Sequence, residues 1–257
     1  MKVLFVRCGD PEPSIEAEHG PFMKWFAEAL GPRVQLEPFD PRVEKCDASR
    51  LENTDGVILS GSPHSVYEPL PWIASLEDLV REAVCNRQRP VLGVCFGHQL
   101  LAQALGGRVI RNPRGREIGT VEITQNADGR TSELLGVLPE RFDAQVTHCD
   151  TVAEPPPGAK VLAVSQRDDC QAFQYGTGWG VQFHPEITAD IMRAYVRSRR
   201  ERIASEGLDP EAILNDVRET DAGRRLLQRF VELVAARSRS AKGRTVGQEE
   251  PLRGAGL

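Results

Sequence analysis

The sequence lacks the long apolar segments that mark membrane and exported proteins. No apolar run reaches about 18 residues, so no membrane-spanning helix is expected. The first apolar stretch, Met1–Arg7, is shorter than the core of a signal peptide, and no cleavage site follows it. We therefore expect a protein that is neither exported nor anchored in a membrane.

An excess of positive charge is also missing. The chain has 32 Lys and Arg against 37 Asp and Glu, a net charge of -5, which gives no general attraction to phosphate backbones or anionic lipids. Neither a nucleic-acid nor a membrane partner is expected. Hydrophobic residues make up 40% and charged residues 27% of the 257 residues, which is typical of a soluble protein and fits one large α/β domain.

Closely spaced cysteines and metal-binding patterns are absent too. No C-x-x-C pair occurs and the histidines show no i, i+4 pairing, which argues against a zinc site or a disulfide framework and indicates a reducing, cytoplasmic location. A phosphate-binding loop and internal repeats are likewise missing, and we expect no metal and no cofactor. The six cysteines are Cys8, Cys46, Cys85, Cys95, Cys149 and Cys170.

The order of the expected elements indicates the fold class. In the first hundred residues, short β-branched runs alternate with helical patterns, which predicts a parallel sheet covered on both faces. Residues 118–183 carry mainly strands and turns, which predicts an antiparallel extension. The expected fold is a three-layer α/β/α domain with a mostly parallel central sheet and a small antiparallel extension. Strands are predicted at 2–6, 34–36, 56–59, 90–94, 121–124, 161–164 and 180–183, and helices at 22–30 and 72–87.

The last third of the chain returns to a helical pattern. Helices are predicted at 211–218 and 221–235, and the apolar stripe of the second is expected to pack on the core. Residues 238–257 are rich in Gly, Arg, Ser and Gln, and we predict a flexible tail there. The predicted domain therefore spans residues 1–237. The stripe consists of Leu226, Leu227, Phe230, Val231 and Val234.

The strongest local motif lies between residues 90 and 102. A buried strand runs into Gly93-Val94-Cys95-Phe96-Gly97 and then into a helix, which is the arrangement of a nucleophile elbow with sulfur in place of a hydroxyl. A side chain at position 93 or 97 would collide with neighbouring elements. The helix amino terminus favours the thiolate form of Cys95. Cys95 is the predicted nucleophile, and the alternative is a small buried core residue.

A cysteine nucleophile needs a base, and the base needs an orienting group. The segment 180–186 ends an apolar strand in His184-Pro185-Glu186. Pro185 favours an extended conformation at His184, and residues two apart in an extended chain project to the same side. Glu186 is therefore expected to hold the imidazole of His184. A surface turn is the alternative interpretation of this segment.

Two further segments are predicted to surround the nucleophile. The run from Thr147 to Asp150 places a histidine beside a thiol, but neighbouring residues of a strand face opposite sides, so we interpret it as a pocket wall. A strand at 57–59 leads into Ser60-Gly61-Ser62-Pro63, where small residues let backbone N–H groups approach an oxyanion. An ordinary turn is the alternative. The amide of Phe96 is the second expected donor.

Together these motifs resemble the class I, triad-type glutamine amidotransferase family, in particular stand-alone members similar to the glutaminase domain of GMP synthase. The similarity covers about residues 2–234. It implies a flavodoxin-like topology and a triad of Cys95, His184 and Glu186. It also implies an oxyanion hole formed by the amides of Ser62 and Phe96. The substrate-binding residues that it implies are Gly61, Gln99, His148, Cys149 and Asp150.

The resemblance also implies a reaction without a cofactor. Cys95 would attack the γ-amide of glutamine, form a γ-glutamyl thioester and release ammonia for an acceptor, which a separate synthetase subunit would activate. A γ-glutamyl peptidase that acts on glutathione-like compounds is the alternative, and a binding subunit without catalysis is a third possibility. Two positions depart from the family pattern: Ser62 replaces a common second glycine, and Cys149 replaces a smaller residue, which puts the substrate pocket in doubt.

Overall fold

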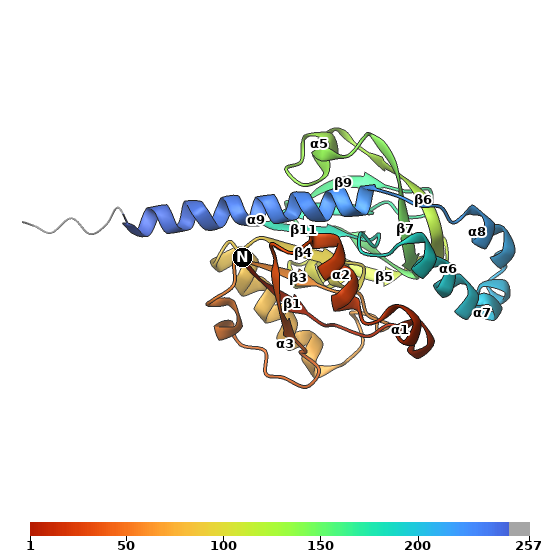
Figure 1. Cartoon of the computed structure of the whole chain (residues 1–257), viewed down its shortest axis with the longest axis horizontal. Coiled ribbons are helices and arrows are strands. Elements are labelled where there is room, and N and C mark those ends of the chain that lie inside the picture. The colour runs from red at the N-terminus through yellow and green to blue at the C-terminus, as the bar shows by residue number, and fades with distance from the viewer. Residues whose placement is uncertain (247–257) are drawn as a thin grey trace, which may run out of the picture.

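The computed structural model describes residues 1–246, and the side chains of residues 1–239. Helices cover both faces of a large sheet, as Figure 1 shows. The strands are β1 (Lys2–Val6), β2 (Gln35–Phe39), β3 (Gly56–Leu59), β4 (Val91–Val94), β5 (Arg108–Arg111), β6 (Glu117–Gln125), β7 (Arg141–His148), β8 (Asp150–Glu154), β9 (Lys160–Val164), β10 (Ala172–Tyr175) and β11 (Gly178–Val181). Each of the seven predicted strands overlaps a strand of the structure, several with different bounds, whereas β5, β7, β8 and β10 were not predicted.

Within the described residues, nine strands form one mixed sheet in the order β2-β1-β3-β4-β11-β10-β9-β6-β7. The strands from β2 to β11 are parallel to one another, and their order corresponds to the 2-1-3-4-5 order of flavodoxin-like folds. The strands from β10 to β7 are antiparallel, and β5 pairs with β8 in a separate small sheet. The predicted parallel sheet with an antiparallel extension is therefore confirmed.

The two faces of the sheet bury two separate apolar clusters. Helices α2 (Phe22–Leu30), α6 (Ala189–Ser198) and α9 (Ala222–Val246) contribute to the cluster on one face. Helices α3 (Pro71–Arg81) and α4 (Phe96–Ala104) contribute to the other. Because both faces are covered, strands such as β3 and β4 are apolar throughout rather than alternating. Shorter helices are α1 (Pro13–His19), α5 (Ala127–Thr131), α7 (Arg200–Ser205) and α8 (Pro210–Asp216).

Some predicted helix boundaries are wrong. The helix predicted at 72–87 is α-helical only as far as Arg81, and the chain then forms a single π turn, Glu82–Asn86. The spacing of apolar residues does not distinguish a π turn from an α-helix. Residues 126–131, within the segment predicted to carry mainly strands and turns, instead include the short helix α5, because the Asn126 side chain caps it by accepting from the Gly129 amide. No helix of the described residues is long and apolar enough to span a membrane.

The carboxy-terminal helix confirms the predicted core stripe but is longer than predicted. Leu226, Leu227, Phe230 and Val234 are fully buried against the sheet, and α9 then extends beyond the body of the molecule (Figure 1). The helix runs to Val246 and does not stop near residue 235. Residues 236–246 lack apolar periodicity, but they contain good helix formers and no proline. A flexible tail at 238–257 stays a prediction, and residues 247–257 lie outside the described residues.

Candidate active site

Three of the predicted motifs lie at the same edge of the sheet. Strands β3, β4 and β11 are parallel neighbours, with Leu59 paired to Gly93 and Val94 paired to Val181. Residues 60–63 follow β3, Cys95 follows β4, and residues 182–186 follow β11. The carboxyl ends of parallel strands form the usual ligand-binding edge of such a sheet. The fold therefore brings together motifs that are about 35 and 90 residues apart in the sequence.

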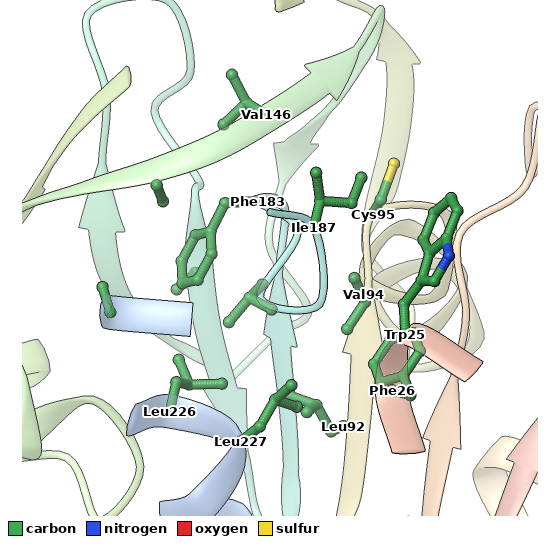
Figure 2. Packing of buried hydrophobic residues seen from close by; sticks show 14 of the residues in the cluster. Trp25, Phe26, Leu92, Val94, Cys95, Val146, Phe183, Ile187, Leu226 and Leu227 are labelled. Atoms are coloured by element: carbon green, nitrogen blue, oxygen red, sulfur yellow. The ribbon is translucent and has the colours of Figure 1, made fainter. Parts of the chain in front are cut away.

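The turn at Cys95 has the geometry of a nucleophile elbow. A Cβ atom at Gly93 would lie 2.3 Å from the Gly97 carbonyl oxygen, and one at Gly97 would lie 2.4 Å from that of Leu59, so the predicted collisions are confirmed. Cys95 itself has φ 53° and ψ -105°, a conformation that costs a non-glycine residue about 1–3 kcal/mol. In Figure 2 its sulfur lies beyond Val94, at the edge of the apolar cluster. The strained turn holds the thiol at the end of the strand.

His184 and Glu186 form the predicted buried contact. Nδ1 of His184 lies 2.8 Å from Oε1 of Glu186, and both side chains are at most 5% exposed. Burial acts to lower the pKa of His184, but the charges of Glu186 and Cys95 outweigh it and raise this pKa to about 10. Within the described residues, the buried Nε2 of His184 has no hydrogen-bond partner. This nitrogen therefore remains available for proton transfer.

Electrostatics link His184 to the thiol of Cys95. Burial acts to raise the pKa of Cys95, but the positive charge of the neighbouring His184 outweighs it, so this pKa is lowered. Gly61 lies against the pair: a Cβ atom there would be 3.2 Å from Cε1 of His184 and 3.9 Å from Cβ of Cys95. In the described part of the chain, the amides of Ser62 and Phe96 donate no hydrogen bond. Both N–H groups, in the residues that follow Gly61 and Cys95, are therefore free to donate a hydrogen bond to a ligand.

These residues open onto a pocket of about 410 Å³. It falls within the usual size range of small-molecule sites, about 300–1,000 Å³. Phe96 and Glu186 do not line it: both are buried, Phe96 behind the elbow and Glu186 behind His184. The other predicted site residues all line the pocket, namely Cys95, His184, Gly61, Ser62, Gln99, His148, Cys149 and Asp150.

The pocket wall contains a buried charge that the sequence did not indicate. Nδ1 of His148 lies 2.9 Å from the carbonyl oxygen of Asp150, and Nε2 lies 3.0 Å from Oε2 of Glu117. Both partners accept hydrogen bonds, so both ring nitrogens carry a proton and His148 is an imidazolium. Its pKa is accordingly raised: burial acts to lower it, but Glu117 and Asp168 have the larger combined effect. Glu117 and Asp168 lie 31 residues before and 20 after His148, and no sequence motif connects them.

A hydrogen-bond network joins this wall to the loop after β3. The carboxylate of Asp150 accepts from Oγ of Ser65 at 2.5 Å and from the hydroxyl of Tyr67 at 3.1 Å. Nε2 of Gln99 donates to the carbonyl oxygen of Asp150 at 3.2 Å and to Gln182 at 2.9 Å. The backbone at Asp150 is thereby fixed from two sides, which makes the wall rigid.

Sequence reasoning also missed the charged residues on the far side of the pocket. They come from loops, a strand end and the helical segment around residues 199–202, and none belongs to a motif. The sequence carries no signal for them, because isolated charged residues in loops have no motif spacing. The residues are Asp10, Glu12, Arg111, Arg116, Arg199 and Arg202.

Known proteins are similar in sequence to a little over half of this chain. Glutamine-hydrolysing GMP synthase of Pyrobaculum aerophilum is 40% identical over 154 residues, which cover 60% of this chain and 28% of that protein. A glutamine-hydrolysing GMP synthase subunit of Sulfurisphaera tokodaii is 37% identical over 139 residues, 53% of this chain and 70% of that one. Gamma-glutamyl peptidase 4 of Arabidopsis thaliana is 33% identical over 145 residues, 55% of this chain and 57% of that one.

A solved structure extends the similarity to most of the fold. The crystal structure of a glutamine amidotransferase of Thermotoga maritima superposes with a TM-score of 0.71 at 27% identity, over 91% of this chain and 97% of that chain. Residues 26–199 match the family model for class-I glutamine amidotransferases, and this range includes the elbow, the pocket wall and the His-Pro-Glu segment. The chain therefore belongs to the class-I glutamine amidotransferase family.

Proposed function

We propose that the chain is a glutaminase that hydrolyses the γ-amide of glutamine through a γ-glutamyl thioester on Cys95. The observation that carries this proposal is the buried set of Cys95, His184 and Glu186, in which the pKa of the thiol is lowered and that of the imidazole is raised. These shifts favour a thiolate beside an imidazolium. A sulfur nucleophile paired with a proton donor is what acyl transfer from an amide requires.

Each step then has a group to perform it. The thiolate of Cys95 attacks the γ-carbonyl carbon, and the amides of Ser62 and Phe96 stabilise the oxyanion that forms. As the carbon–nitrogen bond breaks, His184 gives its proton to the leaving nitrogen, which departs as ammonia. Neutral His184 next takes a proton from water, whose oxygen attacks the thioester. Glutamate leaves and the thiolate is restored, so no cofactor is needed.

Residues of the pocket wall are assigned to the glutamyl part of the substrate. Gly61, Gln99 and the segment 148–150 line the pocket beside Cys95, and the network around Asp150 holds their backbone in place. Preorganised polar groups of this kind fix a small substrate without a large loss of entropy.

The acceptor of the ammonia belongs to a second protein in this proposal. The similar chain from Sulfurisphaera tokodaii is named as one subunit of a GMP synthase, and this supports a partner that is a separate synthetase subunit. In this proposal the partner, and not this pocket, determines which compound receives the ammonia.

A Cys95→Ala variant tests the glutaminase proposal. The purified chain is incubated with L-glutamine, and the release of ammonia and glutamate is measured together with the mass of an acid-quenched acyl-enzyme. We expect Cys95→Ala to abolish both products and the adduct while its thermal unfolding stays that of a folded protein. Cys85 is exposed, so Cys85→Ala is the matched control and should keep full activity. Glutamine hydrolysis that persists in Cys95→Ala contradicts the proposal.

A further inference from the structure

The charged residues that line the pocket offer more free hydrogen-bond donors than free acceptors. Its acids are already engaged: both carboxylate oxygens of Asp150 accept from hydroxyl groups, and those of Asp10 accept from Arg7 and Arg42. Glu12 accepts from Arg199 at 2.6 Å. An incoming ligand therefore finds few free carboxylate acceptors here.

Three arginines, by contrast, keep unused N–H groups. Arg116 is buried and bonds Glu206 through Nε and Nη2, while Nη1 has no carboxylate partner within residues 1–246. Arg199 uses Nε for Glu12 and Nη1 for the hydroxyl of Thr147, which leaves Nη2. The guanidinium of Arg111, which lines the same pocket, donates no hydrogen bond to an acceptor in the described part of the chain.

We propose that Arg116 and Arg199, with Arg111, form a subsite for a carboxylate on the amine portion of the substrate. The preferred substrates are then γ-glutamyl amides of amino acids or short peptides, in addition to glutamine. Guanidinium groups with several N–H donors in a fixed plane match the geometry of a carboxylate. This inference rests on the proposed function, because it assigns a substrate class to the same Cys95 site.

The position of Arg199 favours the leaving amine over the glutamyl part. Its Nη1 lies 2.6 Å from Oγ1 of Thr147, and the carbonyl oxygen of Thr147 lies 3.9 Å from Sγ of Cys95. Thr147 therefore contacts both Arg199 and Cys95, and all three residues line the same pocket. In a γ-glutamyl amino acid, the carboxylate of the leaving group is one carbon atom from the scissile nitrogen. The glutamyl carboxylate is separated from the scissile carbonyl by a three-carbon chain and lies farther away.

The surrounding acids restrain these arginines without using all their donors. Glu206 is shared by Arg116 and Arg202, so the group keeps a net positive charge. Glu12 fixes the plane of Arg199, and the Arg199 guanidinium also lies 4.6 Å from the ring centre of Tyr195. A restrained guanidinium loses less entropy when it binds an anion than a free surface arginine does.

The chemistry remains that of the proposed function. The thiolate of Cys95 forms the thioester bond as the amide carbon–nitrogen bond breaks, and the proton of His184 goes to the leaving nitrogen. An amino acid departs in place of ammonia. Water then hydrolyses the thioester to glutamate, so no oxidant, reductant or further reactant is required.

A matched pair of substrates tests the subsite in the unmodified chain. We would measure kcat/KM for γ-glutamylglycine and for γ-glutamylglycinamide, which differ only in the carboxylate, with L-glutamine in parallel. At least a tenfold preference for γ-glutamylglycine is expected. Equal values, or a preference for the amide, overturn the proposal. Glutamine hydrolysis that depends on Cys95 in the same samples shows that the proposed function holds even if the subsite fails.

Variants then assign the preference to the arginines. Arg116→Gln and Arg199→Gln should each reduce the ratio of the two kcat/KM values by at least fivefold. Arg108 is exposed and pairs with Glu154 away from the pocket, so Arg108→Gln is the matched control and should keep the ratio. If the variants lower kcat/KM for both substrates equally, the arginines bind the glutamyl part and the proposal is wrong. The substrate pair decides the question even if one variant does not fold.

Discussion

The contact between His184 and Glu186 leads to a quantitative prediction for Glu186→Gln. Glutamine keeps the size of the side chain and an oxygen that can accept from Nδ1, so the ring should keep its orientation. It removes the negative charge 2.8 Å from the imidazole. Because this charge helps raise the pKa of His184 to about 10, the variant should lose the imidazolium at a lower pH than the unmodified enzyme.

The size of the effect can be bounded from the geometry. Two unit charges 2.8 Å apart attract by about 6 kcal/mol at an effective dielectric constant of about 20, which is an upper limit. A hydrogen bond to a charged group contributes about 1.5–3 kcal/mol, and the neutral amide retains part of the contact. At about 1.4 kcal/mol per pKa unit, the pKa of His184 should fall by about 1–2 units, to about 8–9.

The assay is the pH profile of kcat/KM for glutamine. Proton donation by His184 is lost as the pH rises through its pKa, so the alkaline limb should move from about 10 to about 8–9 in Glu186→Gln. Alkylation of Cys95 by iodoacetamide at pH 7, followed by peptide mass spectrometry, should also slow because the thiol loses its cationic partner. Asp190→Asn, an exposed acid, is the control. An alkaline limb that does not move in Glu186→Gln refutes the role assigned to Glu186.

Two further predictions concern stability. Gly97→Ala places a Cβ atom 2.4 Å from the carbonyl oxygen of Leu59, so chemical denaturation should show a loss of about 1–3 kcal/mol or more; an unchanged midpoint would contradict the packing described for the elbow. His148→Asn leaves the buried carboxylate of Glu117 without its cation and should destabilise the chain by about 3–5 kcal/mol, part of which the double variant with Glu117→Gln should recover; no recovery would mean that the two residues are not coupled.

The five parallel strands and the catalytic motifs were predictable because their signals are local. A strand, a G-x-C-x-G turn and a helix follow one another within about a dozen residues. A Cβ atom at Gly93 would collide with the start of the helix, and one at Gly97 would collide with the end of β3. His184 and Glu186 are two residues apart, so the extended backbone alone places them together. Their meeting with Cys95 follows from parallel strand order, which alternating strands and helices indicate.

The charge on His148 was not predictable, because it depends on tertiary pairing. The register of β6 against β7 places Glu117 opposite His148, and this register is a property of the assembled sheet. The arginine subsite has the same origin: Arg116 and Arg199 reach one pocket from a strand edge and a helix end that are 83 residues apart. An isolated arginine has no regular spacing to other residues in the sequence, so the sequence does not show whether it lines a pocket or lies on the surface.

The unequal predictability of the two sides of the pocket has a physical reason. On the Cys95 side, the strained backbone at φ 53° requires close packing of small residues, so the chemistry leaves a pattern of glycines in the sequence. On the arginine side, long side chains reach the substrate from a distance, and many backbone positions satisfy the same contact. Substitutions at Gly93 or Gly97 should therefore affect turnover of every amide alike, whereas substitutions at Arg116 or Arg199 should change which amide is preferred.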